Sequence, residues 1–538
     1  MSAAFRALVT WEGRTWDLSP VSAQVREQAS IWDREFTPRT ITLALPMGDT
    51  AALVADGAHY ATMRVQVFLG GRLVSRAPVV GMRCARSGEL TEVEVGNRIA
   101  APRSGTVANP IPSQRTLTVT YIDIAATQEL RAQDKAAAQA EVAADRGWKA
   151  GLSTLAELAD IDHRLRADYF PTVEGRRSEG RVYPIVIGRP GEDGGNPGSS
   201  GEAIPIEYDA TPKLMIAGHP FTGTVTVRGP KYGDPQAMAQ EVLTTEIVTD
   251  ATGRQVTAVA IGASATLEHR WTTSFPEASE KPWFWWIDDA NTAQGLSGAP
   301  VDVIALLLAH VTGIEVDRAA LESCREILAP YALSGVIDVV ADAWDLLTGQ
   351  ILPILPVALV STPAGIGARP IRLDWRAADC RIRLVEGEGV GVIEGPRHVS
   401  TERDDAVCNR VIVTFDSNKE TGQLRRRAFA TADRYGAAAA SVAQLGERER
   451  VISTRWVTRR SVAQLIARDI VERGSSDRLL VSVAVDADRY GVGADGELQA
   501  GDPVLVSLPS YSLTSRVGIV TGILRRGTRV DDVELMLL

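Results

Sequence analysis

The strongest candidate for a binding site is an aromatic run, WFWW at 283–286, which is followed closely by Asp288 and Asp289. Indole rings can stack on sugars, and carboxylate pairs hydrolyse glycosidic bonds. Neighbouring residues of a strand point to opposite faces, however, so two adjacent acids cannot bracket one bond. Large aromatics in a strand are also typical of cores and interfaces. We therefore predict contact with a glycan or with a protein interface through Trp283, Trp285, Trp286 and Asp288.

Motifs for nucleotide, hydrolase and metal chemistry are incomplete. The glycines of VEGEGVGVIEG lack G-x-G-x-x-G spacing, no G-x-x-x-x-G-K-[ST] run exists, and GASAT and GLSGA stop short of G-x-S-x-G. The six histidines and four cysteines have neither metal-ligand nor C-x-x-C spacing, which favours buried free thiols. A cysteine nucleophile beside a distant histidine stays open from the residues alone. The sequence therefore predicts a non-enzymatic chain with no catalytic site, no cofactor and no metal.

Charge and hydropathy exclude further classes. The formal net charge of −10 argues against stable nucleic-acid binding, which needs clustered Lys and Arg. Two short basic runs, LRRR at 424–427 and LRRGTR at 524–529, are read as surface ion pairs beside strands. No signal-peptide pattern opens the chain, and no apolar run could span a bilayer. We expect a soluble protein that is made in the cytoplasm.

The elements that position these residues are mostly strands. The 538 residues exceed a single core, and alternating apolar residues predict antiparallel strands over residues 1–105 and again over most of 396–538. Within the second range, SVAQLIARDIVERG predicts one covering helix. The fold class is therefore α+β, β-rich and multidomain, with two barrel-like antiparallel β-domains flanking a smaller β-domain and a helical inset.

The middle of the chain divides into three segments. Ala, Glu, Gln and Lys predict a helical connector over 106–180. A small β-domain follows over 181–275 and carries a Gly-rich loop at Gly191–Gly201. The helical inset with strands covers 276–395, with one helix starting at the proline of APVDVIALLLAHVTG and a second predicted over GVIDVVADAWDLLTGQILPILP.

Several segments together resemble the tail-hub (baseplate-hub) proteins of long-tailed bacteriophages and gene transfer agents. These are RVYPIVIGRPG with LMIAGHP, the two inset segments just quoted, CNRVIVTFD with SVAQLIARDIVERG, and the closing LQAGDPVLVSLPS, RVGIVTGILRRG and VELMLL. The resemblance covers most of the chain through the order and pattern of its segments, and no single motif is diagnostic of the family.

The resemblance implies a homotrimeric ring at the tail tip of a virion. Each subunit would contribute two barrel-like tube domains, at 1–105 and 396–538. The ring would join the tail tube and distal tail protein to the tip, contact the tape-measure and tip or fibre proteins, and open for passage of genomic DNA during host cell entry. The sequence shows no lysozyme, peptidase or fibre extension, so wall digestion and receptor binding are expected elsewhere in such a tail.

Two alternatives stay open at this stage. A carbohydrate-binding or depolymerising tail protein would use the WFWW run and its acids. A distal-tail or tube component would form a sixfold ring instead of a trimer. The host, the receptor, the residues that line a lumen and the role of the Gly191–Gly201 loop are not given by the residue pattern.

Overall fold

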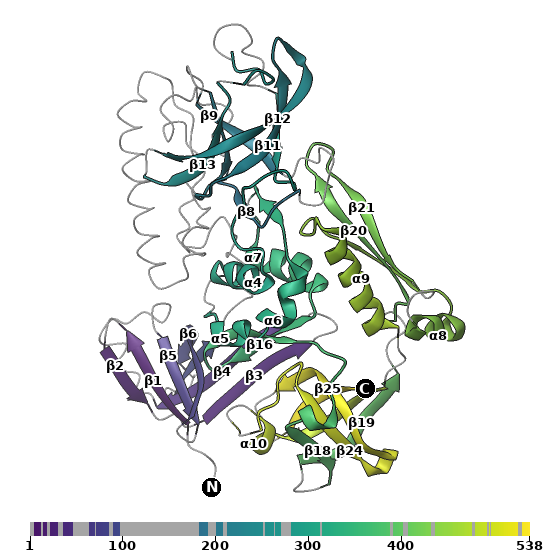
Figure 1. Cartoon of the computed structure of the whole chain (residues 1–538). Helices are drawn as coiled ribbons and strands as arrows, with labels where there is room; N and C mark the ends of the chain where they lie inside the picture. The colour runs from purple at the N-terminus through teal and green to yellow at the C-terminus, as the bar shows by residue number, and fades with distance from the viewer. Residues whose placement is uncertain are drawn as a thin grey trace.

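Strands dominate the computed structural model, which describes residues 5–96 and 182–538 (Figure 1). Within these ranges it leaves out 12–13, 19–21, 31–35, 47–63, 70–71, 85–89, 192–200, 208–211, 251–252, 263, 271–280, 312–314, 340, 388–390, 402–406, 432–435, 476–478, 492–493, 495 and 526–529. The predicted connector over 106–180 and most of the Gly191–Gly201 loop lie outside the described residues.

The N-terminal segment forms seven antiparallel strands in the order β2-β1-β5-β6-β7-β4-β3. Alternation of apolar and polar residues places Ala7, Val9, Val65 and Val67 in the buried layer of this sheet. We name these seven strands the N-terminal sheet. Their bounds are β1 Phe5–Trp11, β2 Arg14–Leu18, β3 Ser22–Ser30, β4 Phe36–Pro46, β5 Arg64–Leu69, β6 Arg72–Cys84 and β7 Leu90–Gly96.

The C-terminal strands close into a ring. Each pairs with the next in the order β25-β24-β18-β19-β23-β26, and β26 pairs back with β25. The pairs β24–β18 and β18–β19 are parallel and the others antiparallel. Leucine and valine side chains from these strands form one buried cluster. We name this barrel-like unit the C-terminal ring; its bounds are β18 Ile382–Glu386, β19 Gly391–Thr401, β23 Leu479–Asp486, β24 Pro503–Leu508, β25 Leu513–Arg525 and β26 Val530–Leu537.

One strand, β25, belongs to the ring and also pairs with β3 of the N-terminal sheet. Its first half pairs with β24, and its last residues, 522–525, pair with residues 27–30 of β3. The two ends of the described chain therefore lie in a single 13-stranded sheet. Figure 1 shows β3 running directly against β25 at the base of the molecule.

A second closed barrel lies between these ends in sequence and at the opposite end of the molecule (Figure 1). Every pairing in it is antiparallel. Gly201 and Gly229 lie against Trp285 and Trp283, where an added Cβ would approach the indoles to 2.5 and 2.1 Å. We name it the middle barrel; its strands are β9 Gly201–Glu207, β10 Lys213–Ala217, β11 Thr224–Lys231, β12 Asp234–Thr249, β13 Gln255–Ala260 and β14 Trp283–Trp286.

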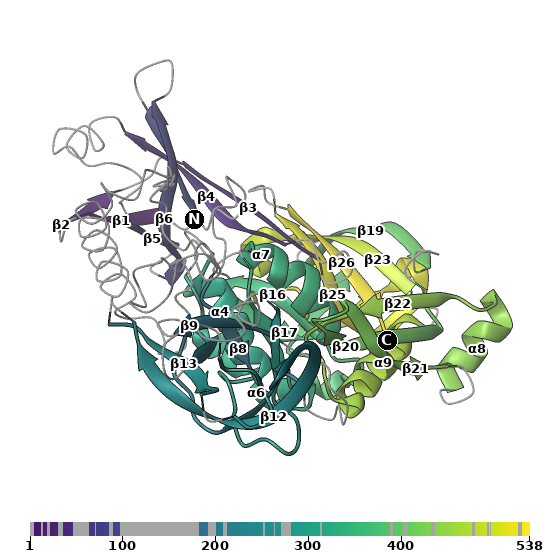
Figure 2. The same ribbon diagram turned by 90° about the horizontal axis from the view of Figure 1, so that it is seen from above.

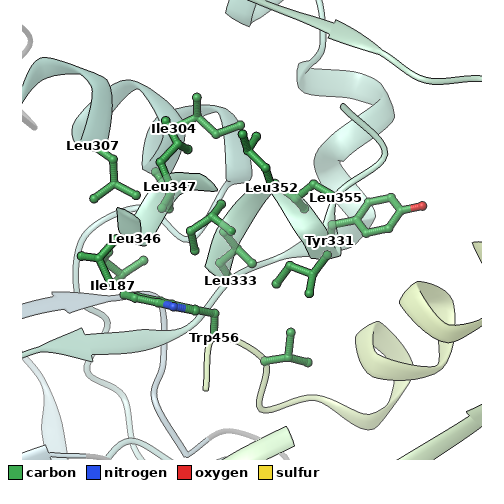
Figure 3. Packing of buried hydrophobic residues seen from close by; sticks show 14 of the residues in the cluster. Ile187, Ile304, Leu307, Tyr331, Leu333, Leu346, Leu347, Leu352, Leu355 and Trp456 are labelled. Carbon is green, nitrogen blue, oxygen red and sulfur yellow. The ribbon is translucent and has the colours of Figure 1, made fainter. Parts of the chain in front are cut away.

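The helical inset lies between the barrel and the ring. Pro300 begins α4, where its missing N–H costs nothing, and the helix ends at Ala309. The inset buries a large leucine-rich core, part of which Figure 3 shows with Trp456 closing one side. Its other elements are α5 Arg318–Glu322, α6 Arg325–Leu328, α7 Ala343–Leu346, the hairpin β16 Val357–Thr362 with β17 Gly365–Pro370, and β15 Gly335–Ile337, which pairs with β8 Ile185–Ile187.

The second predicted inset helix is interrupted. Val336 and Ile337 lie in strand β15, and α7 begins only after Asp342, whose carboxylate accepts the Asp345 N–H. One π-helical turn, Leu347–Ile351, and one 3-10 turn, Leu352–Ile354, follow. The segment predicted as one helix is therefore a buried strand followed by several short helical turns. The capping aspartate starts a new helix within the segment, and Pro353 interrupts the helical hydrogen bonds.

A three-stranded sheet is inserted into the ring between β19 and β23. Its order is β21-β20-β22, and α9, Arg460–Gly474, packs on β20 and β21. The helix buries residues at helical spacing, Val462, Ala463, Ile466 and Ile470 among them. Viewed from above, this insertion projects to one side of the ring (Figure 2). Its other elements are β20 Arg410–Asn418, β21 Gln423–Ala430, α8 Gly436–Leu445 and β22 Glu449–Ser453.

The predicted fold class is confirmed: the protein is α+β, β-rich and multidomain. The structure adds the placement of its parts. Five strands of the closed barrel come from the expected smaller β-domain and the sixth, β14, from the range predicted as the helical inset. The N-terminal sheet and the C-terminal ring are continuous, and the predicted covering helix packs on the insertion. The five domain boundaries stay a prediction.

Candidate functional site

Two charged residues of the C-terminal ring occupy positions that the strand period assigns to its interior. Asp531 has the same phase on β26 as Val533 and Leu535, and Arg525 has the same phase on β25 as Ile523. Both are almost fully buried, Arg525 at 3% and Asp531 at 4% exposure. Buried charges need partners, so these positions mark an ionic site.

Arg525 is held by partners from three segments. Its Nε donates to Glu27 Oε2 at 3.1 Å and its Nη1 to Asp531 Oδ2 at 2.9 Å. The backbone carbonyls of Tyr490 and Leu498 accept further bonds from the guanidinium. Glu27 lies on β3, so this one side chain connects the N-terminal sheet to the C-terminal ring.

A second ion pair continues the site toward the helical inset. Arg369, on β17, places Nη1 3.1 Å from Asp502 Oδ1, at the turn before β24. Asp502 also accepts the Gln499 N–H at 2.8 Å, and the Gln499 side chain both accepts from Arg369 and donates to the Ser361 carbonyl. We name the five ionised residues the charge junction: Glu27, Arg525, Asp531, Asp502 and Arg369.

The surroundings of two acids of the charge junction, Asp531 and Asp502, raise their pKa values. Burial raises the pKa of Asp531, Arg525 lowers it, and Glu27 and Asp532 raise it further, for a net increase. Burial also raises the pKa of Asp502, and Arg369 with the Gln499 N–H only partly offsets that effect. In this cluster Arg525 binds Glu27 and Asp531, and Arg369 binds Asp502. Its chemistry is therefore that of a structural joint that can take up a proton.

The aromatic residues predicted as a contact site lie inside the protein. Trp283 and Trp285 point into the middle barrel, and Trp286 is buried on its other side; none exceeds 2% exposure. The Trp286 Nε1–H donates to Asp288 Oδ2 at 2.9 Å, and the other oxygen of Asp288 accepts the Ala290 N–H. The structure thus brings Trp286 and Asp288 together in a turn and leaves no open indole face. Contact with a glycan or an interface stays a prediction.

A second buried polar group lies at the mouth of the middle barrel. His219 accepts the Val186 N–H at 3.1 Å through Nε2, and its carbonyl accepts the Thr257 hydroxyl. Burial, aided by the Arg254 charge, lowers the pKa of His219 to about 4. Arg254 lies over the Tyr183 ring, 4.5 Å from its centroid. This histidine, which is neutral at pH 7, therefore ties the segment after β10 to strand β8.

The remaining candidates are dispersed. The predicted surface pairing of the basic runs is wrong for Arg525, which is buried, and for Arg425, which pairs with buried Asp416. Cys324, Cys380 and Cys408 do not form disulfide bonds. Within the described residues, no group of three or more His, Cys, Asp and Glu side chains could hold a metal ion, and no helix has the length and apolar content to span a membrane.

Sequence reasoning did not find the charge junction, although part of the signal was present. Asp531 and Arg525 interrupt an apolar period, which is the signature of a buried charge. The partner residue could not be found this way, because Glu27 is 498 positions from Arg525.

Comparisons with known proteins give structural similarities only. No family model matches the chain, and no curated protein matches it. The chain is similar to a tail protein from Neisseria meningitidis MC58, at 9% identity and a TM-score of 0.33, over 99% of this chain and 96% of that one. The chain is also similar to a 43 kDa tail protein of prophage MuSo2 from Shewanella oneidensis, at 9% identity and a TM-score of 0.35, over 99% of this chain and 98% of that one. A third similar structure is a chain from the virion of a native gene transfer agent, at 15% identity and a TM-score of 0.37, over 70% of this chain and 87% of that one.

Proposed function

We propose that this chain is a structural tail protein of a phage or gene transfer agent virion, and that it forms the trimeric tail-tip hub. In this role it joins the tail tube and distal tail ring to the tip and surrounds a gated path for DNA ejection. Its partners are then two further copies, the distal tail, tube, tape-measure and tip or fibre proteins, and passing DNA. It is made in the host cytoplasm and acts without catalysis.

The observation that carries the proposal is the continuity of the 13-stranded sheet through β3 and β25. A hub subunit of the kind that the sequence resembles places two β-units side by side in the wall of a ring. Residues 5–96 and the closing strands of this chain lie side by side in that way, in one sheet.

The net charge of the chain agrees with this role. The formal net charge of −10 leaves DNA without a broad basic surface to bind, so that it can pass. A permanent ring needs obligate contacts between copies, and such contacts bury on the order of 2,000 Å² or more per interface. We expect each interface of the trimer to reach that size.

Cryo-EM class averages of intact tails test the proposal. We expect density for this chain on the tail axis at the tip, with threefold symmetry, and labelling of a tagged chain at the same position. Sixfold density would instead identify a distal-tail or tube component. Density away from the axis would remove the hub proposal altogether.

A further inference from the structure

The three-stranded sheet of the insertion ends on an open edge strand. Within the described residues, β22 pairs with β20 alone, and the ladder runs parallel and without a bulge from Glu449 to Ser453. On the other side of the sheet, α9 packs on β20 and β21, and its Gln464 donates to the Phe429 carbonyl at 2.6 Å. The insertion lies at the side of the molecule in both views (Figures 1 and 2).

The backbone of β22 alternates between groups that bond β20 and groups that point outward. The Arg448 carbonyl accepts a bond from β20, and the Thr454 N–H donates one to it. Every second residue of a parallel ladder bonds the same neighbour, so these two residues fix the phase. Glu449, Val451 and Ser453 therefore direct their N–H and C=O groups away from β20. A row of outward groups of this kind is a template for a further strand.

The side chain at the centre of this edge is apolar and exposed. Val451 is 55% exposed, and Phe429 of β21 is 41% exposed. Both are in register with Ile412 of β20, so the three side chains form one apolar row across the sheet. Val411 and Val413, which alternate with Ile412, belong to the buried cluster that includes α9. The row therefore lies on the face opposite α9 and ends at the open edge.

The residues of β22 are complementary to a second, antiparallel copy of the same strand. With Val451 opposite Val451, Glu449 faces Ser453 and Arg450 faces Ile452. No like charges then oppose each other, and the outward N–H and C=O groups of the two copies meet. A pairing centred on Glu449 would oppose two carboxylates, which is unfavourable. A pairing centred on Ser453 would leave a single residue pair within the two strands.

We propose that β22 is a contact site for a second copy of this chain, through antiparallel pairing of the two β22 strands about a two-fold axis at Val451. The pair at Val451 and the two pairs of Glu449 with Ser453 each exchange two backbone hydrogen bonds. The two sheets become one, and their apolar rows meet at the axis.

Two five-residue strands bury less than the roughly 1,200 Å² of stable complexes, so this dimer forms reversibly. A two-fold contact cannot close a threefold ring, and the inference is therefore independent of the hub role.

Disulfide trapping in the full chain tests the pairing. The two Cα atoms of a hydrogen-bonded antiparallel pair are about 5.5 Å apart, which a disulfide can span. Under mild oxidation we expect Val451→Cys to form a covalent dimer on a denaturing gel without reductant, with the linked peptides identified by mass spectrometry. The gel detects linked pairs of chains, so its result is the same whether the chain is otherwise a monomer or a trimer.

Ser453→Cys is the matched control on the same strand. In the proposed register its two thiols lie four residues apart along the strands, about 14 Å, and cannot be linked. The unsubstituted chain carries the same four native cysteines and gives the background. A yield of dimer from Val451→Cys no greater than this background overturns the proposal. An equal yield from Ser453→Cys also overturns it, because it would indicate random collision.

A proline at the same position tests the outward bonds separately. The Val451 N–H does not bond β20, so Val451→Pro is compatible with an edge strand, but it removes one donor from each copy. We expect the dissociation constant of the dimer, measured by sedimentation over a range of concentrations, to rise about tenfold with an unchanged circular dichroism spectrum. Val451→Thr keeps the N–H and should stay close to the wild type. If Val451→Pro does not fold, the disulfide test decides alone.

Discussion

The middle barrel and the C-terminal ring are both closed by six strands, but different forces hold them. The barrel uses strands within 201–286, all antiparallel, around an interior that includes two indoles. The ring takes strands from 382–537, includes parallel pairs, and shares β25 with the N-terminal sheet. The first is built from strands close in sequence around an aliphatic and aromatic interior. Closure of the second depends on distant segments and on buried charge.

The pKa values of buried carboxylates also shift in opposite directions in the two units. Beside the barrel, burial raises the pKa of Glu268, but Arg270 and the N–H groups of Gly233 and Arg270 outweigh it and lower the pKa to about 2. In the ring, burial dominates, and the pKa values of Asp531 and Asp502 are raised. Acid should therefore weaken the barrel while it strengthens the ring's junction.

Trp285→Ala should give the largest difference in stability between the middle barrel and the C-terminal ring. The indole is fully buried against Gly201, so its removal leaves a cavity that costs about 3–5 kcal/mol of unfolding free energy. Denaturant unfolding, read with hydrogen exchange by region, should place the loss in the barrel peptides and leave those of the ring unchanged.

An exposed aromatic provides the matched control for that variant. Tyr511 lies at the end of the ring with 48% exposure, and Tyr511→Ala should have little effect on either unit. An equal loss of protection in the ring of Trp285→Ala would mean that the two units unfold together.

A smaller effect, dependent on pH, is expected for Glu268→Gln. Glu268 binds Arg270 through both oxygens, at 2.9 and 2.8 Å, and is fully buried. Its pKa is lowered on folding, so its contribution is complete above its ordinary value of 4.5 and is lost as the pH falls toward about 2. The variant should lose about 2 kcal/mol at pH 7 and only about a quarter of that at pH 2.5, where the pH approaches the folded pKa. Urea titrations at both values measure this; an equal loss at both would attribute it to packing.

The smallest effect is expected for Arg6→Gln. The Arg6–Asp17 pair is bidentate, yet its side chains are 58% and 53% exposed. Water and salt screen such pairs, so the midpoint of urea unfolding should not change measurably. A clear shift would show that even the surface of the N-terminal sheet depends on charge.

The sequence predicted what depends on local pattern. The alternation in RVIVTF, LLVSVAV and VELML was read correctly as strands, and α9 was read from its apolar spacing. Which strands become neighbours depends on contacts between distant residues, so ring closure through the parallel β18–β24 pair was not predictable. The burial of the WFWW run was not predictable for the same reason. Four consecutive aromatic residues do not indicate which faces of the strand other elements will cover.

The pairing of β3 with β25 has a consequence for synthesis. Glu27 and Arg525 are 498 positions apart, and at about 5–20 residues per second the ribosome reaches the second about 25–100 s after the first. During that interval the edge of β3 that later pairs with β25 is unpaired, and unpaired edges can pair with strands of other chains. Chaperone binding and translation speed should therefore affect the yield of this protein.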